Sequence, residues 1–404
     1  MDIIAILGRQ PELSLAELEG RFGAGAIRQF SDESAIIEAD SFDIQTLGGI
    51  QKAGRIVAEL EFTPWDRLSR DISQRYAHEL KGDGKLTLGL SVYGLEVHPR
   101  DIQRTGLALK QALKKKGRSV RLVPNDFQVL STATSHHNKL GLSDNKLEIM
   151  VVYGRNSVII ADSLGSQNIS ALAARDQARP HTDAFVGMLP PKLALMMINM
   201  SGISAIAESS RAKTSTEDNK GEHNTLRVLD PFCGTGVVLQ EAALLGFDVF
   251  GTDLADKMVE YSKANMEWLG RKHRTGSIVV ETGDAQTHTW QAPISAVVAE
   301  TYLGQPFSAP PAPDKLDKVR GVVDGIIDGF LKNLASQIEP GTPLCLAVPA
   351  WRDSTGRFTY LPVILHLEAL GYQWQSFKHV DAKHLIYYRE DQIVGRQLLI
   401  LRRK

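Results

Sequence analysis

The feature that most constrains the fold is a strand-like segment followed by a glycine turn in the middle of the chain. Residues 226–229 lead into Asp230-Pro231-Phe232-Cys233-Gly234-Thr235-Gly236, and a helical pattern starts near Val237. Two glycines let the backbone of such a turn approach a ligand closely, and the following helix offers unpaired N–H groups. We therefore expect a doubly wound α/β sheet with a ligand at this turn, where such folds bind their ligands.

The residues of the turn narrow the class of ligand. No Gly-Lys-Ser/Thr follows, so the turn is not a phosphate-binding P-loop. A nicotinamide fingerprint needs three glycines, and this turn has two. The acid Asp230 ahead of the glycines favours a ligand with a positive group, such as the methionyl ammonium. A plain tight turn is the alternative.

Two downstream acids support a bound nucleoside. Asp253 ends the second strand, where an acid can bond ribose hydroxyls, and Asp284 follows the third strand, where it can accept from an adenine amino group. Either acid alone could be a helix cap, but three acids at successive strand ends predict S-adenosylmethionine. The predicted cofactor-binding residues are Asp230, Phe232, Cys233, Gly234, Thr235, Gly236, Asp253, Leu254, Asp284 and Ala285. We expect Cys233 to pack and not to act as a nucleophile.

The pattern along the chain predicts three sections. Residues 1–65 form a small α+β module with strands at 3–7, 35–37 and 55–60, a helix that starts at a Ser14/Glu17 capping box, and a second helix before the last strand. Residues 66–175 hold helices at 66–80 and 100–116 and strands at 86–92, 119–123, 146–152 and 157–161, the last two joined by a hairpin. Residues 176–404 hold parallel strands at 226–229, 249–252, 277–281, 295–299 and 344–348, then an antiparallel edge pair at 372–379 and 394–401. We expect a surface loop at 207–224.

A basic cluster lies in the second section. The chain as a whole carries a net charge of −1, but residues 100–121 hold eight Lys and Arg and one acid, Asp101. The cluster could be a solvated helix end that complements the helix dipole, or a surface that contacts nucleic-acid phosphates. For the second hypothesis the predicted RNA-binding residues are Lys114, Lys115, Lys116, Arg118 and Arg121.

The turn resembles the first motif of class I methyltransferases, in particular that of the THUMP-domain tRNA guanosine N2-methyltransferases that act on position 10 in archaea and eukaryotes. Three further segments are similar: residues 7–14, residues 135–139, and the junction with Arg175-Asp176, Arg179-Pro180 and residues 187–193. The resemblance implies a ferredoxin-like domain (1–65), a THUMP RNA-binding domain (66–175) and a class I Rossmann-like methyltransferase domain (176–404). It also implies tRNA as the partner.

The fourth motif departs from the family. The family has Asp/Asn-Pro-Pro-Tyr/Phe at the end of the fourth strand, whereas this chain has Glu300-Thr301-Tyr302-Leu303-Gly304. We expect Glu300 to accept from the target amine and Tyr302 to stack on the base. The alternative is that the motif has decayed and Glu300 is a strand-end charge. Guanine N2 is the favoured target, and adenine N6 is the second.

Two alternative functions remain open, whereas a metal site and a membrane span are not expected. A ribosomal RNA methyltransferase and a catalytically inactive RNA-binding protein with the same fold are the alternatives, and the sequence does not tell whether a small activating subunit is needed. We expect no metal site, because His136 and His137 have no spaced partner acids or cysteines. With two cysteines, no signal peptide and no apolar run near 20 residues, we expect a cytoplasmic protein without a membrane span.

Overall fold

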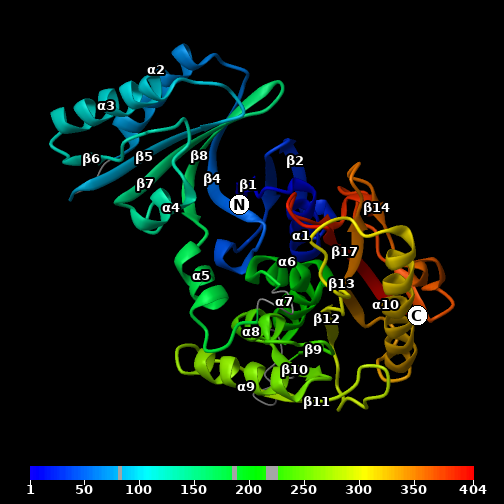
Figure 1. The fold of residues 1–404 in the computed structure, drawn as a ribbon. Coiled ribbons are helices and arrows are strands. Elements are labelled where there is room, and N and C mark those ends of the chain that lie inside the picture. Colours follow the sequence, from blue (N-terminus) through cyan, green and yellow to red (C-terminus); the bar gives the residue numbers. More distant parts are fainter. Residues whose placement is uncertain (81–83, 184–188, 215–225) are drawn as a thin grey trace. The chain divides into compact units, whose positions relative to one another are not determined.

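The computed structural model describes residues 1–80, 84–183, 189–214 and 226–404 of the 404-residue chain (Figure 1). These residues form two compact units. The N-terminal unit comprises residues 1–15 and 25–171, and the C-terminal unit comprises residues 16–24 and 172–404. The chain therefore passes between the units twice near its N-terminus.

The first part of the N-terminal unit has a ferredoxin-like strand order. Strands β1 (Asp2–Leu7), β2 (Ile27–Ser31), β3 (Ser34–Glu38) and β4 (Ile50–Glu61) lie in the order β2-β3-β1-β4, with every neighbouring pair antiparallel. The helix predicted before β4 is only a 3₁₀ turn, Ile44–Thr46. Helix α1 (Pro11–Phe22) exists as predicted, but Ser14 does not cap it. Ser14 is buried within the helix, where its hydroxyl accepts the Gly8 N–H and donates to the Gly49 carbonyl.

The second part of this unit continues the same sheet. Its elements are α2 (Trp65–Glu79), β5 (Leu86–Tyr93), α3 (Pro99–Lys115), β6 (Val120–Leu122), α4 (Thr132–His137), β7 (Lys146–Tyr153) and β8 (Ser157–Ser166). Helices α2 and α3 lie side by side (Figure 1) and bury their apolar sides on β5, β7 and β8. The hairpin predicted at residues 155–156 joins β7 to β8, and β8 pairs with β4. One sheet thus runs across the predicted boundary at residues 65 and 66.

The C-terminal unit contains the predicted doubly wound sheet. Its strands are β9 (Arg227–Asp230), β10 (Asp248–Asp253), β11 (Ile278–Thr282), β12 (Ala296–Glu300), β13 (Pro343–Arg352), β14 (Phe358–Thr359), β15 (Tyr372–Trp374), β16 (Ile386–Tyr387) and β17 (Val394–Arg403). The order is β11-β10-β9-β12-β13-β17-β15, with the first five strands parallel and β17 antiparallel to both of its neighbours. The predicted antiparallel pairing of β15 with β17 is confirmed, but β15 ends at Trp374 and not at residue 379.

Helices cover both faces of this sheet. Helices α6 (Pro191–Ser201), α8 (Val237–Leu244), α9 (Asp256–Gly270) and α10 (Pro313–Ala335) pack on its strands. Helix α7 (Ile203–Thr214) packs on α6, and α5 (Ile169–Gln177) contacts α8 through Arg175 and Glu241. Helix α10 packs Phe330 and Leu331 on the face that carries Val297 and Leu346, while α6 packs on β12, β13 and β17. The side chains of alternate strand residues therefore face either α10 or α6.

Two sequence expectations concern the segments beside these helices. The loop predicted at 207–224 is helical in its first part, because α7 continues to Thr214; the rest, 215–224, lies outside the described residues, as do Gly187 and Met188. Among the described residues, no single helix is long and apolar enough to span a membrane. The pair formed by α6 and the first part of α7, bent by 58°, meets that criterion of length and composition together.

Candidate active site

The glycine turn joins β9 to α8 at the carboxyl edge of the parallel strands, and its two glycines have different roles. Both have left-handed backbone conformations, with φ of +49° at Gly234 and +83° at Gly236. A Cβ on Gly236 would lie 2.5 Å from the Ser262 hydroxyl of α9, so this glycine permits close helix packing. A Cβ on Gly234 would have only the Phe232 carbonyl oxygen near it, at 4.0 Å. Gly234 therefore faces open space, where a ligand can approach the backbone.

Asp253 fixes the shape of this turn. One carboxylate oxygen accepts the Gly234 N–H at 2.9 Å, and the other accepts the Ala255 N–H at 2.9 Å. The next side chain, Leu254, is 73% exposed. An acid with an exposed apolar neighbour can present both a hydrogen-bond acceptor and an apolar surface to a nucleoside.

Asp230 is the most buried of the predicted ligands. Only 2% of the residue is exposed, and its carboxylate accepts the Phe232 N–H at 3.1 Å. Burial, with the nearby carboxylates of Asp253 and Glu300, raises the pKa of Asp230 well above its ordinary value. No described basic side chain forms an ion pair with Asp230 or Asp253. A cationic ligand would compensate this group of acids, which suits a sulfonium or ammonium group.

The remaining residues of the turn hold it in place. The Cys233 N–H donates to the Thr252 carbonyl, and its sulfur would lie 3.2 Å from a Cβ on Gly251, so Cys233 packs tightly against β10. Burial raises the pKa of the Cys233 thiol well above its usual range, which opposes a nucleophilic role. Phe232 packs edge-on against Phe330, and the Thr235 carbonyl accepts from Asn265 at 2.9 Å.

The third predicted acid is held in a local turn. Asp284 follows β11, is partly exposed, and accepts the Gln286 N–H at 2.9 Å, while Ala285 beside it is buried. Asp230, Asp253 and Asp284 thus follow or end three strands that are neighbours in the sheet. The predicted order of the three acids along one sheet edge is present in the structure.

Glu300 has a partner that the sequence did not reveal. It ends β12, and its carboxylate oxygen Oε1 lies 2.5 Å from Nε of Arg396 on β17. Burial raises the pKa of Glu300, while the Arg396 guanidinium opposes that rise. Tyr302, two residues later, is 46% exposed, so its ring is accessible at the surface of the unit. Arg396 lies in the strand predicted at 394–401, and a signal for its pairing is its position as the lone basic residue of this apolar stretch.

The predicted RNA-binding residues of α3 and the segment after it differ in exposure. Lys114, Lys115 and Arg121 are exposed, and Lys116 donates from Nζ to the Ala77 carbonyl. Arg118 is only 8% exposed, and its guanidinium donates to the Asn145 side chain at 2.8 Å. Arg118 has a structural contact inside the unit, so we no longer expect it to bind RNA.

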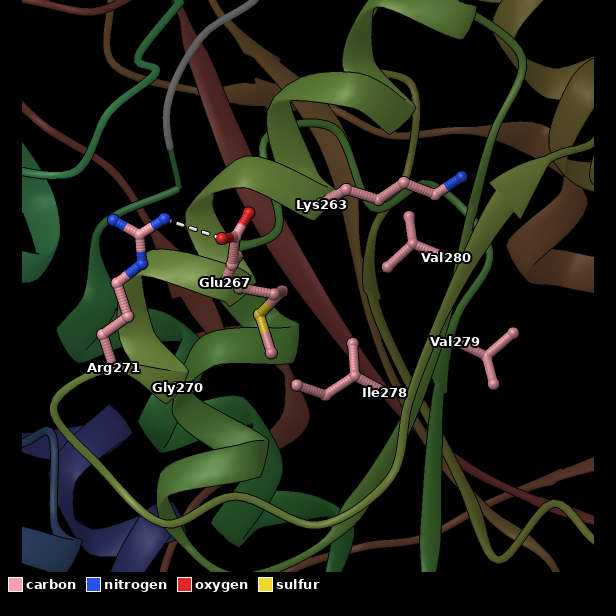
Figure 2. A pocket seen from close by; sticks show the side chains of 8 residues that line it. Lys263, Glu267, Gly270, Arg271, Ile278, Val279 and Val280 are labelled. Carbon is pink, nitrogen blue, oxygen red and sulfur yellow. Dashed lines mark hydrogen bonds and ion pairs between the residues drawn. The ribbon is translucent and has the colours of Figure 1, made fainter.

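The described surface also has two grooves away from the glycine turn. The first has a volume of about 610 Å³ and lies between α9 and β11. Figure 2 shows Lys263, Glu267 and Arg271 on one side of it and Ile278 and Val280 on the other. None of the predicted donor-binding residues lines it. The second, of about 620 Å³, lies at the start of α3 beside Arg100 and Arg104. Among the described residues, no group of three or more His, Cys, Asp or Glu side chains could hold a metal ion.

The strand order and the glycine turn define a Rossmann-like methyltransferase fold. Among solved structures, TrmN from Thermus thermophilus is similar over 100% of this chain and 99% of that chain, with a TM-score of 0.51 and 17% identity, which shows the fold alone.

Curated relatives are similar over part of the chain. The tRNA (guanine(10)-N2)-dimethyltransferase of Methanothermobacter thermautotrophicus is 32% identical over 180 residues, 44% of this chain and 44% of that protein. The protein of the same name from Pyrococcus abyssi is 34% identical over 121 residues, 30% of this chain and 26% of that protein. The chain thus spans less than half the length of these curated relatives. No family model matches.

Proposed function

We propose that this protein is an S-adenosylmethionine-dependent methyltransferase that modifies the exocyclic N2 amine of a guanine in tRNA. The observation that carries the proposal is the glycine turn, with Gly234 open to a ligand and Asp253 bonded to its N–H, at the edge where Asp230, Asp284 and Glu300 also lie. The relatives named as tRNA (guanine(10)-N2)-dimethyltransferases supply the substrate class.

The donor fits the residues present at the turn. The uncompensated carboxylates of Asp230 and Asp253 suit its positive groups, Asp253 retains acceptor capacity for ribose hydroxyls, and exposed Leu254 offers an apolar surface to the adenine. When bound, S-adenosylmethionine supplies an electrophilic methyl group, which joins the amine nitrogen as the donor leaves as S-adenosylhomocysteine and the amine loses one proton.

Glu300 and Tyr302 would act on the base. A carboxylate that accepts from the amine becomes more favourable as positive charge develops on the nitrogen, so Glu300 would stabilise the transition state more than the bound substrate. The exposed Tyr302 ring would stack on the base and hold it in place. An exocyclic amine needs only this orientation and electrostatic help, because no covalent enzyme intermediate is required.

RNA binding would involve the N-terminal unit. The α2-α3 layer on a mixed sheet, with exposed Lys114 and Lys115 at the end of α3 and Arg121 after it, supports a THUMP-type RNA-binding region that contacts phosphates. These cations would add affinity without reading bases. A tRNA substrate also fits the cytoplasmic location that the cysteine usage favours.

The second candidate function is that of an inactive RNA-binding protein, and the Glu300–Arg396 pair is the observation that favours it. A carboxylate that already forms an ion pair with an arginine could stabilise the sheet and have no catalytic role. Transfer of a labelled methyl group to total tRNA from cells that lack the protein, with ribosomal RNA in parallel, separates the candidates. The proposal expects label in tRNA; donor binding without label in either RNA favours the inactive protein.

A further inference from the structure

Arg396 reaches Glu300 across an intervening strand. Glu300 lies beside Ala347 in the pairing of β12 with β13, and Arg396 lies opposite Pro349 in the pairing of β13 with β17. Residues two apart in a strand point to the same face, so Ala347 and Pro349 are the β13 side chains between the pair. Both are short, which leaves the guanidinium room to cross β13.

Arg396 crosses β13 on the face of the sheet that α6 covers. Leu346 and Val348 belong to the core cluster on the α10 side, which places Ala347 and Pro349 on the opposite face. Among the residues of α6, only Lys192 is charged, and it is exposed at the start of the helix. The carboxylates of Glu300 and Asp253 both act on Asp230. On the other side, Tyr387 of β16 lies opposite Arg396. Arg396 is therefore the cation that the described residues place on Glu300.

The pair is too buried to be an ordinary surface ion pair. The side chains keep 14% of their exposure at Glu300 and 9% at Arg396. Burying two charges is costly, and a pair of apolar residues would stabilise this position about as well. Oε1 of Glu300 accepts from Arg396, whereas no described residue donates to Oε2. One oxygen of the carboxylate is thus fixed and the other is left with an unused acceptor.

We propose that Arg396 is a positioning residue that holds Glu300 in place through Oε1, so that Oε2 faces the amine of the target base. This inference rests on the proposed function for the identity of the amine. It explains how an acid followed by Thr301 and Tyr302 can be held: an arginine from β17 fixes its side chain. Arg396 contacts neither donor nor base in this role.

The test combines two variants of Arg396 with a control on the same strand. Arg396→Gln removes the charge, Arg396→Lys retains it, and Arg402→Gln removes a β17 arginine that bonds Gln375 and the Gly341 carbonyl instead. In single-turnover transfer to tRNA, we expect Arg396→Gln to be about 10- to 100-fold slower, with donor and tRNA dissociation constants unchanged. Arg396→Lys should recover part of the wild-type rate, and Arg402→Gln should transfer methyl at the wild-type rate.

The pH dependence separates positioning from a merely structural role. Without the guanidinium, the pKa of Glu300 rises further, so the ionised carboxylate appears at higher pH and the acid limb of the rate profile moves upward. In a Glu300→Gln background, Arg396→Gln should not move that limb. Equal slowing by Arg402→Gln, or an unmoved limb in Arg396→Gln, overturns the inference.

A readout without methyl transfer keeps the inference testable if the proposed function fails. The ¹³C carboxyl resonance of Glu300 can be identified by its loss in Glu300→Gln, and its titration followed in the protein alone. Titration at higher pH in Arg396→Gln than in wild type shows that the guanidinium keeps Glu300 ionised in the protein alone, which the positioning role requires whatever the substrate is. Identical titration of the two proteins overturns it, even if the wild type methylates tRNA.

Discussion

The carboxylate of Asp253 accepts the N–H of Gly234 at 2.9 Å, so the acid that ends the second parallel strand also shapes the glycine turn after the first. Its place at the end of the second strand predicts contact with ribose hydroxyls. The structure gives it two backbone N–H groups as well, from Gly234 and Ala255. Loss of this side chain should therefore disturb the donor site in two ways.

We predict that Asp253→Ala weakens S-adenosylmethionine binding by at least tenfold, about 1.4 kcal/mol. The variant loses the ribose acceptor and releases the Gly234 N–H. Asp253→Asn retains an acceptor oxygen and should lose less. Isothermal calorimetry measures both, with Asp381→Ala as a control that also removes a carboxylate bonded to a backbone N–H. Unchanged affinity in a folded Asp253→Ala protein would refute the assignment.

The two glycines of the turn should respond differently to alanine. At Gly236 the new Cβ meets the Ser262 hydroxyl at 2.5 Å and the left-handed backbone is strained, so we expect the free energy of unfolding to fall by about 2–4 kcal/mol. At Gly234 only the strain applies, about 1–2 kcal/mol, but the methyl occupies the open side and should weaken donor binding more than tenfold. Urea denaturation and calorimetry on both variants test this contrast. Equal donor affinity for wild type and Gly234→Ala would contradict it.

Asp230 should make stability depend on pH in a defined direction. Its pKa is raised in the folded state, so between its ordinary value and the raised value the folded protein holds a proton that the unfolded chain has lost. Stability from this group is therefore present at low pH and is lost as pH rises. Asp230→Asn keeps the shape of the side chain without its charge. In the donor-free protein, this variant should not lose stability from residue 230 as pH rises. Urea midpoints of the two proteins at several pH values should converge toward low pH; parallel curves would be inconsistent with the burial argument.

The exposed cations at the end of α3 should contribute to RNA affinity through charge alone. Lys114→Gln with Lys115→Gln should weaken tRNA binding and lower the slope of log affinity against log salt by just under about 1 per lost phosphate contact. Arg118→Gln removes one charge from a buried position and should affect stability instead. Filter binding across salt concentrations checks the slope. A slope equal to that of wild type would show that the lysines only solvate the helix end.

The sequence predicted the parallel strands and the glycine turn because their signals are local. An apolar segment followed by two glycines, as at residues 226–236, has few other structures open to it, and acids at strand ends follow from the alternation of strands and helices. The sequence could not predict that Gly236 permits helix packing while Gly234 faces open space, because the difference depends on Ser262 of another helix.

The residues whose contacts the sequence did not reveal all have distant partners. Ser14 has the spacing of a capping box, yet Gly8 and Gly49 use its hydroxyl. Arg118 looks like part of a basic cluster, but Asn145 binds it. Arg396 meets Glu300 only because the strand order places β13 between β12 and β17. Such contacts are set by how the chain folds, and no local sequence pattern indicates them.

Methyl transfer to a guanine amine under the control of Glu300 is tested most directly by nucleoside mass spectrometry of an unmodified tRNA transcript after single-turnover reaction. We predict N2-methylguanosine with the wild type, and formation about 10²–10³ times slower with Glu300→Gln, which keeps one acceptor oxygen but loses the charge. Donor and tRNA dissociation constants should change much less, because the interaction strengthens in the transition state. Methylation at another atom, or an equal rate with Glu300→Gln, would contradict the proposed chemistry.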